Sequence, residues 1–190
     1  MVRVLAQQWI SADGFAAGPG GEGDIFAAVT DAAAPEAHNR ALLPGFGEVL
    51  LGRATYELFA AFWPYADHQP MAATVNAMRR TVASRTLGSA PWGSHAPASV
   101  VPDAAAHVRT ATADVIVWGS LTLMRSLLRD GLLTEVELFV APVFLGAGRP
   151  LLGSGNAGVD VRLDLVESEQ FPASVQRLRY AVRPRRRPAA

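Results

Sequence analysis

The sequence predicts an α/β fold, in which helices flank a central mixed, mostly parallel sheet that ends in an antiparallel pair of C-terminal strands. Two patterns indicate this class: short β-branched apolar runs alternate with segments of helical spacing, and the last third of the chain is rich in strands. Half of the 190 residues are hydrophobic and 18% are charged, as in globular chains. The length fits one domain over residues 1–183, followed by a flexible basic tail at 184–190.

The hydrophobic pattern predicts each element in turn. Buried strands are expected at residues 2–11, 49–51, 81–84, 99–101 and 114–118. Helices are expected at residues 36–43, 53–64, 70–79, 120–130 and, in a short piece, from Asp103. A long strand at 134–143 precedes the antiparallel pair, which is predicted at 161–169 and 174–182. The Gly-rich stretch 18–24 predicts a mobile loop without regular structure.

Missing residue types exclude several kinds of chemistry. All 17 basic residues are Arg, so a Schiff-base lysine and a P-loop are both excluded. The absence of Cys excludes disulfides, Cys-ligated zinc, iron–sulfur clusters and thiol nucleophiles. We therefore predict no metal site.

Charge and hydropathy narrow the choice of partner and location. The formal net charge is zero, which gives no electrostatic reason to expect nucleic acid or an anionic membrane as partner. No segment approaches the roughly 20 apolar residues of a membrane span, and the N-terminal apolar stretch is too short for a signal peptide. A cytoplasmic protein that acts on a small molecule is the expectation.

The most informative segment runs from Asp114 to Gly131. A β-branched strand breaks at Gly119-Ser120 and passes directly into a helix that Gly131 ends. The unpaired N–H groups at such a helix start, with the helix dipole, are suited to bind a phosphate. Ser120 as an ordinary N-cap is the alternative interpretation.

Two further strand ends carry groups that suit phosphate. Gly52-Arg53-Ala54-Thr55 opens the second helix, and Ser84-Arg85 follows the next strand. Arg binds phosphate oxygens bidentately, and ligands of open α/β sheets gather beyond the carboxyl ends of the strands. Arg53 in a first helical turn is unfavourable for a cation, unless an anion lies beside it or the side chain points into solvent.

The ordered set of short motifs resembles the dihydrofolate reductase-like superfamily. It is most similar to the branch that contains the reductase domain of bacterial riboflavin biosynthesis and its stand-alone relatives. The segments that carry the resemblance are 11–14 (Ser-Ala-Asp-Gly), 52–56, 82–87, 117–120, 131–138 and 141–148, the last reading Ala-Pro-Val-Phe-Leu-Gly-Ala-Gly.

This resemblance implies NADPH as cofactor. Arg53 and Thr55 would then hold phosphate, while Ser84 and Arg85 would hold the 2′-phosphate. Gly119, Ser120, Leu121 and Thr122 would cradle the pyrophosphate next to Gly52. The nicotinamide would lie near Trp9, Ser11, Asp13 and Ala16. In dihydrofolate reductase the pyrophosphate turn has more glycine, and here Ser120 and Leu121 replace two of those positions.

The substrate side is less defined by the sequence. Asp13, Asp24 and Glu36 are candidate acids, although each also has a structural role to explain it, and His38 is interpreted as a surface histidine. Asp13 is the weak catalytic candidate. Five aromatic residues either form a pocket that stacks a planar substrate ring or belong to the core. They are Trp9, Phe15, Phe26, Phe62 and Trp63.

We therefore expect an NADPH-dependent reductase of a small heterocyclic or carbonyl substrate. One alternative is a pyrimidine reductase of riboflavin synthesis, acting on a 5-amino-6-ribosylaminouracil-type compound. Another is a non-catalytic NADP-binding dimeric sensor. The resemblance also implies a homodimer, with residues 134–182 as the expected contact.

Overall fold

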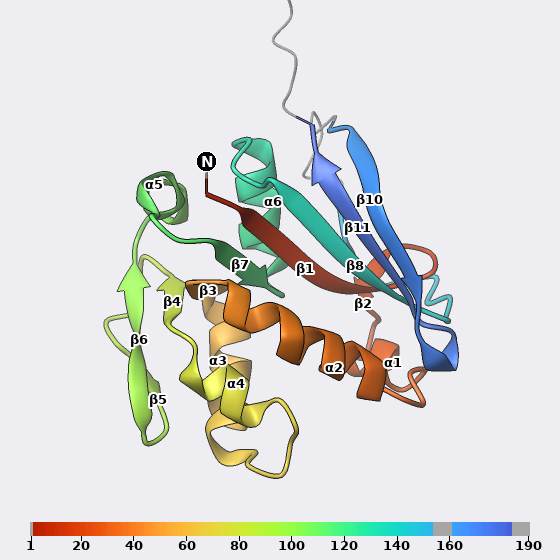
Figure 1. The fold of residues 1–190 in the computed structure, drawn as a ribbon, viewed down its shortest axis with the longest axis horizontal. Helices are drawn as coiled ribbons and strands as arrows, with labels where there is room; N and C mark the ends of the chain where they lie inside the picture. Colours follow the sequence, from red (N-terminus) through yellow and green to blue (C-terminus); the bar gives the residue numbers. More distant parts are fainter. Residues whose placement is uncertain (1, 154–160, 184–190) are drawn as a thin grey trace, which may run out of the picture.

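A twisted sheet organises the molecule (Figure 1). The computed structural model describes residues 2–153 and 161–183, and in these the main sheet has nine strands in the order β10-β11-β8-β1-β7-β3-β4-β6-β5. The strands of this sheet are β1 (Val4–Ser11), β3 (Glu48–Gly52), β4 (Arg80–Ala83), β5 (Ala90–Trp92), β6 (His95–Val101), β7 (Val115–Trp118), β8 (Glu135–Ala141), β10 (Leu163–Gln170) and β11 (Gln176–Val182).

The pairing confirms the predicted mixed sheet. The strands from β8 through β1, β7, β3 and β4 to β6 pair in parallel. Strand β11 runs antiparallel to β8, and β10 runs antiparallel to β11, which gives the predicted antiparallel end. Because the central strands are parallel, all their carboxyl ends meet at one edge of the sheet. We call this edge the rim.

Helices cover both faces of the sheet. They are α1 (Gly23–Phe26), α2 (Ala33–Leu42), α3 (Arg53–Phe62), α4 (Ala72–Ala77), α5 (Ala104–Thr110) and α6 (Leu121–Arg129), with 3-10 turns η1 (Leu43–Gly45), η2 (Trp63–Tyr65) and η4 (Pro172–Ser174). In Figure 1, α2 lies in front of the sheet and α6 behind it. Adjacent residues of β1 reflect this division, because Ala6 joins the cluster that α6 covers, whereas Gln7 bonds to Asn39 of α2.

The core follows from the alternation along each strand. Helix α6 buries Leu123, Met124, Leu127 and Leu128, which confirms its predicted helical spacing. They pack with alternate residues of β1 and β7 such as Val4 and Val117. A second cluster on the other face includes Leu5, Leu51 and Trp92.

The sequence did not predict several short strands. Strands β5 and β6 form a hairpin within residues 90–101, where the sequence shows Pro and Gly breaks. The hairpin tolerates Pro91 and Pro97 because it lies at the sheet's edge, and Trp92 anchors it in the core. A two-stranded sheet of β2 (Phe15–Ala17) and β9 (Arg149–Pro150) was also not predicted.

The prediction for residues 18–24 was wrong at its end, because Gly23 and Asp24 begin α1. Burial of Ile25 and a bond from the Gly20 N–H to the Asp24 carboxylate (2.8 Å) hold this short helix against the loop. The predicted basic tail at 184–190 lies outside the described residues.

Candidate active site at the rim of the sheet

The three predicted phosphate segments lie side by side. Strands β7, β3 and β4 are neighbours in the sheet and run parallel, so the residues that follow them share the rim. Gly119 to Thr122 follow β7, Gly52 to Thr55 end β3 and begin α3, and Ser84-Arg85 follow β4. Ser11 ends β1, the strand on the other side of β7.

The Gly119-Ser120 bend is joined directly to the start of α3. Both residues have left-handed backbones, with φ near +60°. The Ser120 hydroxyl accepts a hydrogen bond from the Gly52 N–H (2.7 Å), and the Ser120 N–H donates to the Thr55 hydroxyl (3.1 Å). The side chains of Ser120 and Thr55 therefore hold the rim together.

The bend leaves backbone donors available at the start of α6. Ser120 occupies the N-cap position, but its hydroxyl makes no capping bond to the helix. Within the described residues, nothing accepts from the N–H groups of Leu121, Thr122 and Leu123. Thr122 is exposed, so this helix start faces outward with its positive dipole end. Such a start fits an anionic group of a cofactor.

The two arginines of the rim differ in their bonding. Arg53 pairs with Glu57 one helical turn later (2.7 Å) and donates to the Thr86 hydroxyl (3.1 Å). The acidic partner at i+4 explains how a cation is tolerated in a first helical turn. Arg85 is exposed and forms no hydrogen bond or ion pair with any described residue. The Ser84 hydroxyl accepts from the Leu87 N–H (3.1 Å) and so shapes the loop that presents Arg85.

Asp13 is a clamp between two loops. Its carboxylate accepts from the Ser11 hydroxyl (2.5 Å), the Gly146 N–H (2.7 Å) and the Leu145 N–H (3.1 Å). The bond from Ser11 is the largest of the effects that lower the pKa of Asp13 below its ordinary value, and the backbone N–H groups add to it. The carboxylate therefore stays ionised at neutral pH, which does not suit it as a proton donor.

Asp13 also locates the Ala-Pro-Val-Phe-Leu-Gly-Ala-Gly segment. The clamped Leu145 and Gly146 belong to the connection that leads to β9, which pairs with β2 just after Asp13. Gly148 has φ +128°, and a Cβ there would come within 2.1 Å of the Ala17 carbonyl oxygen. Glycine is thus required for the close approach of these two loops.

The aromatic residues divide into two groups. Trp9 stacks on Phe139 (4.9 Å between centroids) and meets Phe26 edge-on (5.5 Å). Trp63 stacks on Trp118 (6.3 Å) and contacts Phe62 (5.1 Å). Trp118 on β7 is the register partner of Gln7 on β1, and Trp9 lies two residues after Gln7 on the same strand. Phe15, the fifth predicted residue, lies on β2 and makes no ring contact with another described residue.

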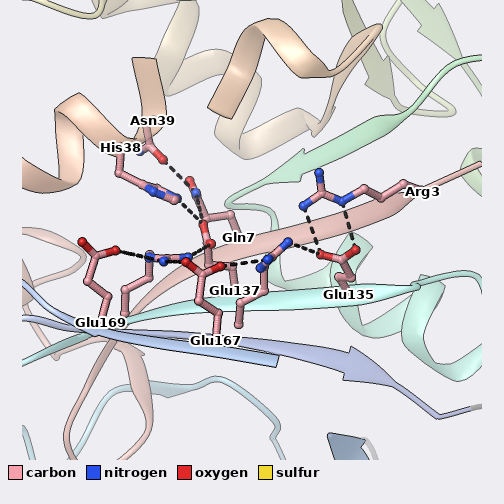
Figure 2. Close-up of polar contacts among 10 residues, drawn as sticks. Arg3, Gln7, His38, Asn39, Glu135, Glu137, Glu167 and Glu169 are labelled. Atoms are coloured by element: carbon pink, nitrogen blue, oxygen red, sulfur yellow. Dashed lines mark hydrogen bonds and ion pairs between the residues drawn. The ribbon is translucent and has the colours of Figure 1, made fainter. Parts of the chain in front are cut away.

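Sequence reasoning missed a buried polar network on the face that α2 covers (Figure 2). Its centre is Glu137 on β8, whose side chain is fully buried. The Glu137 carboxylate accepts from Gln7 (2.7 Å) and the imidazole of His38 (3.1 Å), and it pairs with Arg177 (2.9 Å). The Gln7 amide also donates to Asn39 (2.8 Å), so β1, β8, β11 and α2 all meet at this point.

Further carboxylates surround Arg177. This guanidinium is 2% exposed and also pairs with Glu167 and Glu169 of β10. Burial alone raises the pKa of Glu137, but hydrogen bonds from His38 and Gln7 and the contact with Arg177 outweigh it and lower the pKa to about 2. Glu137 is therefore a permanent anion in the protein interior.

The interpretation of His38 as a surface histidine was wrong. Its side chain is only 18% exposed and binds the buried Glu137. The available signal was the alternation Glu135-Val136-Glu137-Leu138, which puts two carboxylates on the same face as Phe139. Glu36 bonds to no described residue through its side chain, and Asp24 is engaged by Gly20.

Within residues 2–153 and 161–183, no three His, Asp or Glu side chains gather in a way that would hold a metal ion. None of the helices there combines the length and apolar character that crossing a membrane requires.

Comparison with known proteins identifies relatives of this fold. The model of the RibD C-terminal domain family matches residues 3–176. No curated protein sequence matches the chain significantly. A putative riboflavin biosynthesis protein from a Shewanella species is similar in structure, with a TM-score of 0.78, 18% identity and coverage of 96% of this chain and 100% of that one.

Two other solved structures extend the comparison. A pyrimidine reductase-like protein from Corynebacterium diphtheriae has a TM-score of 0.59 at 16% identity, covering 97% of this chain and 93% of that chain. RibD from Acinetobacter baumannii has a TM-score of 0.68 at 20% identity and is covered over 58% of its length, against 96% of this chain. The chain thus spans just over half of that longer protein. At these identities the structures show a shared fold.

Proposed function

The chain belongs to the RibD C-terminal domain family, and on that premise we propose that it is an NADPH-dependent reductase of a small heterocyclic or carbonyl substrate. The rim is the single observation that carries the proposal. Three adjacent strand ends present helix-start amides and a guanidinium that have no partner among the described residues, together with a bend of two left-handed residues. Together these groups suit the several phosphates of one dinucleotide.

Each rim residue has a role in this proposal. The amides of Leu121 and Thr122, presented by the Gly119-Ser120 bend, would bind the pyrophosphate. Thr55 and Gly52 would support that bend through their bonds to Ser120. Arg85, with Ser84 shaping its loop, would bind the 2′-phosphate that distinguishes NADPH from NADH. Arg53 would add positive charge from the start of α3.

The cofactor supplies a hydride from the C4 atom of its nicotinamide. The protein's own part is to hold that ring beside the acceptor at the ends of β1 and β8. Asp13 and Ser11 fix the two loops that border this place, and Trp9, stacked on the buried Phe139, gives it an apolar floor. An apolar, aromatic environment at this place favours a planar substrate.

Cofactor titration tests the proposal directly. The intrinsic fluorescence of the protein is measured against NADPH and against NADH, and NADPH oxidation is followed with a panel of C=O and C=N acceptors. We expect micromolar binding of NADPH and oxidation with at least one acceptor. A folded protein that fails to bind NADPH at micromolar concentration would refute the whole proposal.

Arg85→Ala sharpens this test. Loss of a bond to a charged group costs about 1.5–3 kcal/mol, so NADPH affinity should fall roughly 10- to 100-fold, while NADH affinity stays the same. Arg109→Ala is the matched control, since Arg109 is also exposed and without a partner among the described residues, but lies on α5 away from the rim. Equal effects of the two variants would contradict a specific 2′-phosphate site.

A second candidate activity is reduction of a ribosylaminouracil-type pyrimidine. It is favoured by the structural similarity to the pyrimidine reductase-like protein. Including such a pyrimidine in the acceptor panel distinguishes the two, because only this activity requires it to be the preferred acceptor. A protein that binds NADPH yet oxidises it with no acceptor would instead be the non-catalytic sensor.

The proposal includes a homodimer. Strand β10 is the outermost strand of the sheet at its C-terminal side, and Leu163, Leu165 and Val166 on it are about half exposed. An exposed apolar edge strand favours pairing with another chain. A cytoplasmic location remains our expectation.

A further inference from the structure

Reduction of a C=O or C=N bond needs a proton as well as a hydride, and the sequence offers no convincing donor. Asp13 is an ionised clamp that is already bonded to Ser11 and to the Leu145 and Gly146 amides. Asp24 closes its own loop. A proton donor must therefore be sought elsewhere on the substrate side.

His38 has the bonding pattern of such a donor. Its Nε2 atom lies 3.1 Å from a carboxylate oxygen of Glu137. Since the ionised carboxylate can only accept, Nε2 must carry a hydrogen. Within the described residues nothing bonds to the other ring nitrogen, Nδ1, and the side chain is 18% exposed. Glu137 thus orients the imidazole and leaves Nδ1 available, as a carboxylate does for a catalytic histidine.

The position of His38 also fits this role. The imidazole meets the Phe139 ring edge-on (5.9 Å), and Phe139 stacks on Trp9 (4.9 Å). Trp9 and Phe139 are paired residues of β1 and β8, two positions before Ser11 and Ala141 at the rim. His38 therefore packs against the buried ring that supports Trp9, the residue that the proposed function places beside the substrate.

Charged and polar groups from three strands surround the imidazole. Glu137 faces it from β8, Gln7 from β1 is neutral, and Arg177 from β11 lies behind Glu137. Arg177 is shared among three carboxylates, because Glu167 and Glu169 of β10 also bind it. Arg179, also on β11, pairs with Glu167 as well (2.8 Å), so two guanidinium groups and three carboxylates make up the cluster behind the imidazole.

We propose that His38, oriented by Glu137, is the catalytic proton donor of the reduction, an inference that rests on the proposed function. As hydride adds to the substrate carbon, the π electron pair of the C=O or C=N bond moves to the oxygen or nitrogen. The Nδ1–H bond of the imidazolium breaks, and its proton joins that pair. Neutral His38 keeps its Nε2–H bond, which still donates to Glu137, and regains a proton at Nδ1 from solvent hydronium or buffer acid. The sum is one substrate, one NADPH and one proton, giving reduced substrate and NADP⁺.

The chain offers a closely matched control. His107 on α5 also directs Nε2 to a carboxylate, that of Glu48 (2.7 Å), and its side chain is 20% exposed. Glu48 begins β3, so this pair lies at the edge of the sheet opposite the rim. Both histidines thus bind a buried carboxylate through Nε2 but lie at opposite edges of the sheet, and Glu48 accepts from the Thr81 hydroxyl (2.6 Å) where Glu137 pairs with Arg177.

The test compares His38→Gln with His107→Gln, using the acceptor that the wild-type protein reduces fastest in the panel. Glutamine keeps a donor for the carboxylate but has no proton to give at the Nδ1 position. For His38→Gln we expect kcat to fall roughly 100-fold or more, with NADPH affinity unchanged. If His38 donates the proton, the wild-type rate should fall as the pH rises, and this fall should be absent in the variant. His107→Gln should retain wild-type kcat and its pH profile.

Two results would overturn the inference. One is a His38→Gln enzyme with wild-type kcat and pH profile. The other comes from ¹H–¹⁵N spectra of the imidazole rings at high pH, which need no substrate: we expect the Nε2–H tautomer for His38, and an Nδ1–H tautomer would contradict the geometry. A wild-type protein that reduces no acceptor would refute the proposed function instead, while the tautomer still decides the orientation of His38.

Discussion

Two carboxylates illustrate how burial determines the structural role of a residue. Asp13 is exposed and serves as an acceptor for loop amides, whereas Glu137 is sealed inside the sheet and serves as a fixed charge. Removing one member of a buried ion pair leaves an uncompensated charge, which costs about 3–5 kcal/mol. Removal of the Glu137 carboxylate should therefore lower the free energy of unfolding more than removal of the Asp13 carboxylate.

We expect Glu137→Gln to lose about 3 kcal/mol of unfolding free energy at pH 7. The folded state lowers the pKa of Glu137 from 4.5 to about 2. Its stabilisation is thus fully present above pH 4.5 and is lost as the pH falls toward 2. Urea denaturation at pH 7 and pH 3 should show the gap between wild type and variant narrowing in acid.

Glu135→Gln is the control for this change. Glu135 lies on the same strand and also pairs with two arginines, Arg3 and Arg179, but it is 22% exposed. Its loss should cost about 1 kcal/mol or less. Equal losses from the two variants, or a gap that does not depend on pH, would show that burial of Glu137 is not the source of the effect.

The backbone conformation of single residues was predictable from the sequence where the chain must turn sharply. Gly119 and Ser120 form the expected bend, because a strand that passes directly into a helix needs a sharp turn there. The partners of Ser120 were not predictable, since Gly52 and Thr55 lie more than 60 positions away. The same holds for His38, whose partner Glu137 is 99 positions distant. Long-range side-chain pairing carries no local signal.

At the scale of elements, length decided what the sequence could predict. Longer periodic segments such as α3 and α6, of 10 and 9 residues, were predicted, because more than two turns establish a clear apolar face. Strands β2 and β9, of three and two residues, are too short for any alternation to show. Their pairing depends instead on the loop contacts around Asp13.

This dependence predicts the effect of Asp13→Asn. Asparagine has only one acceptor oxygen in place of two, so it cannot accept from Ser11, Leu145 and Gly146 as the wild-type carboxylate does. We expect hydrogen exchange of these two amides, and of the β2–β9 pair, to accelerate while α6 keeps its protection. The measurement is amide exchange followed by mass spectrometry or NMR.

Asp67→Asn is the control, because Asp67 is exposed and its side chain bonds to no described residue. It removes the same charge without touching the loops. Unchanged protection of Leu145 and Gly146 in Asp13→Asn would mean that the two loops are held by their backbone pairing alone.

On the scale of the whole molecule, the sheet separates an apolar flank from a charged one. On β10 and β11, Arg177, Arg179, Glu167 and Glu169 lie on the α2 side, and Leu165 is paired with Tyr180, which packs against the α6 side. The order of these layers followed from the alternation of strands and helices. Whether another chain covers the apolar flank is a separate question that mutation can answer.

We expect Leu165→Glu to convert the proposed homodimer to a monomer. A charge at a half-buried apolar contact would have to be desolvated in the dimer without a partner. Leu165 is 56% exposed in the monomer, so the monomer itself should tolerate the change. Sedimentation equilibrium gives the mass of each form.

Leu58→Glu is the matched control, since Leu58 on α3 is 61% exposed and lies far along the sheet from β10. It should leave the mass at that of a dimer. A monomeric wild-type protein, or a dimer that survives Leu165→Glu, would contradict the assignment of β10 as the contact.

The bonds that Ser120 makes to Gly52 and Thr55 have a consequence for how this protein can change. They couple two helix starts into one rigid mount, so neither can be repositioned alone. Substitutions that change the cofactor preference of the proposed NADPH site should therefore accumulate at Arg85, whose side chain has no partner among the described residues, and spare the mount. Directed evolution toward NADH would be expected to leave residues 119 and 120 as they are.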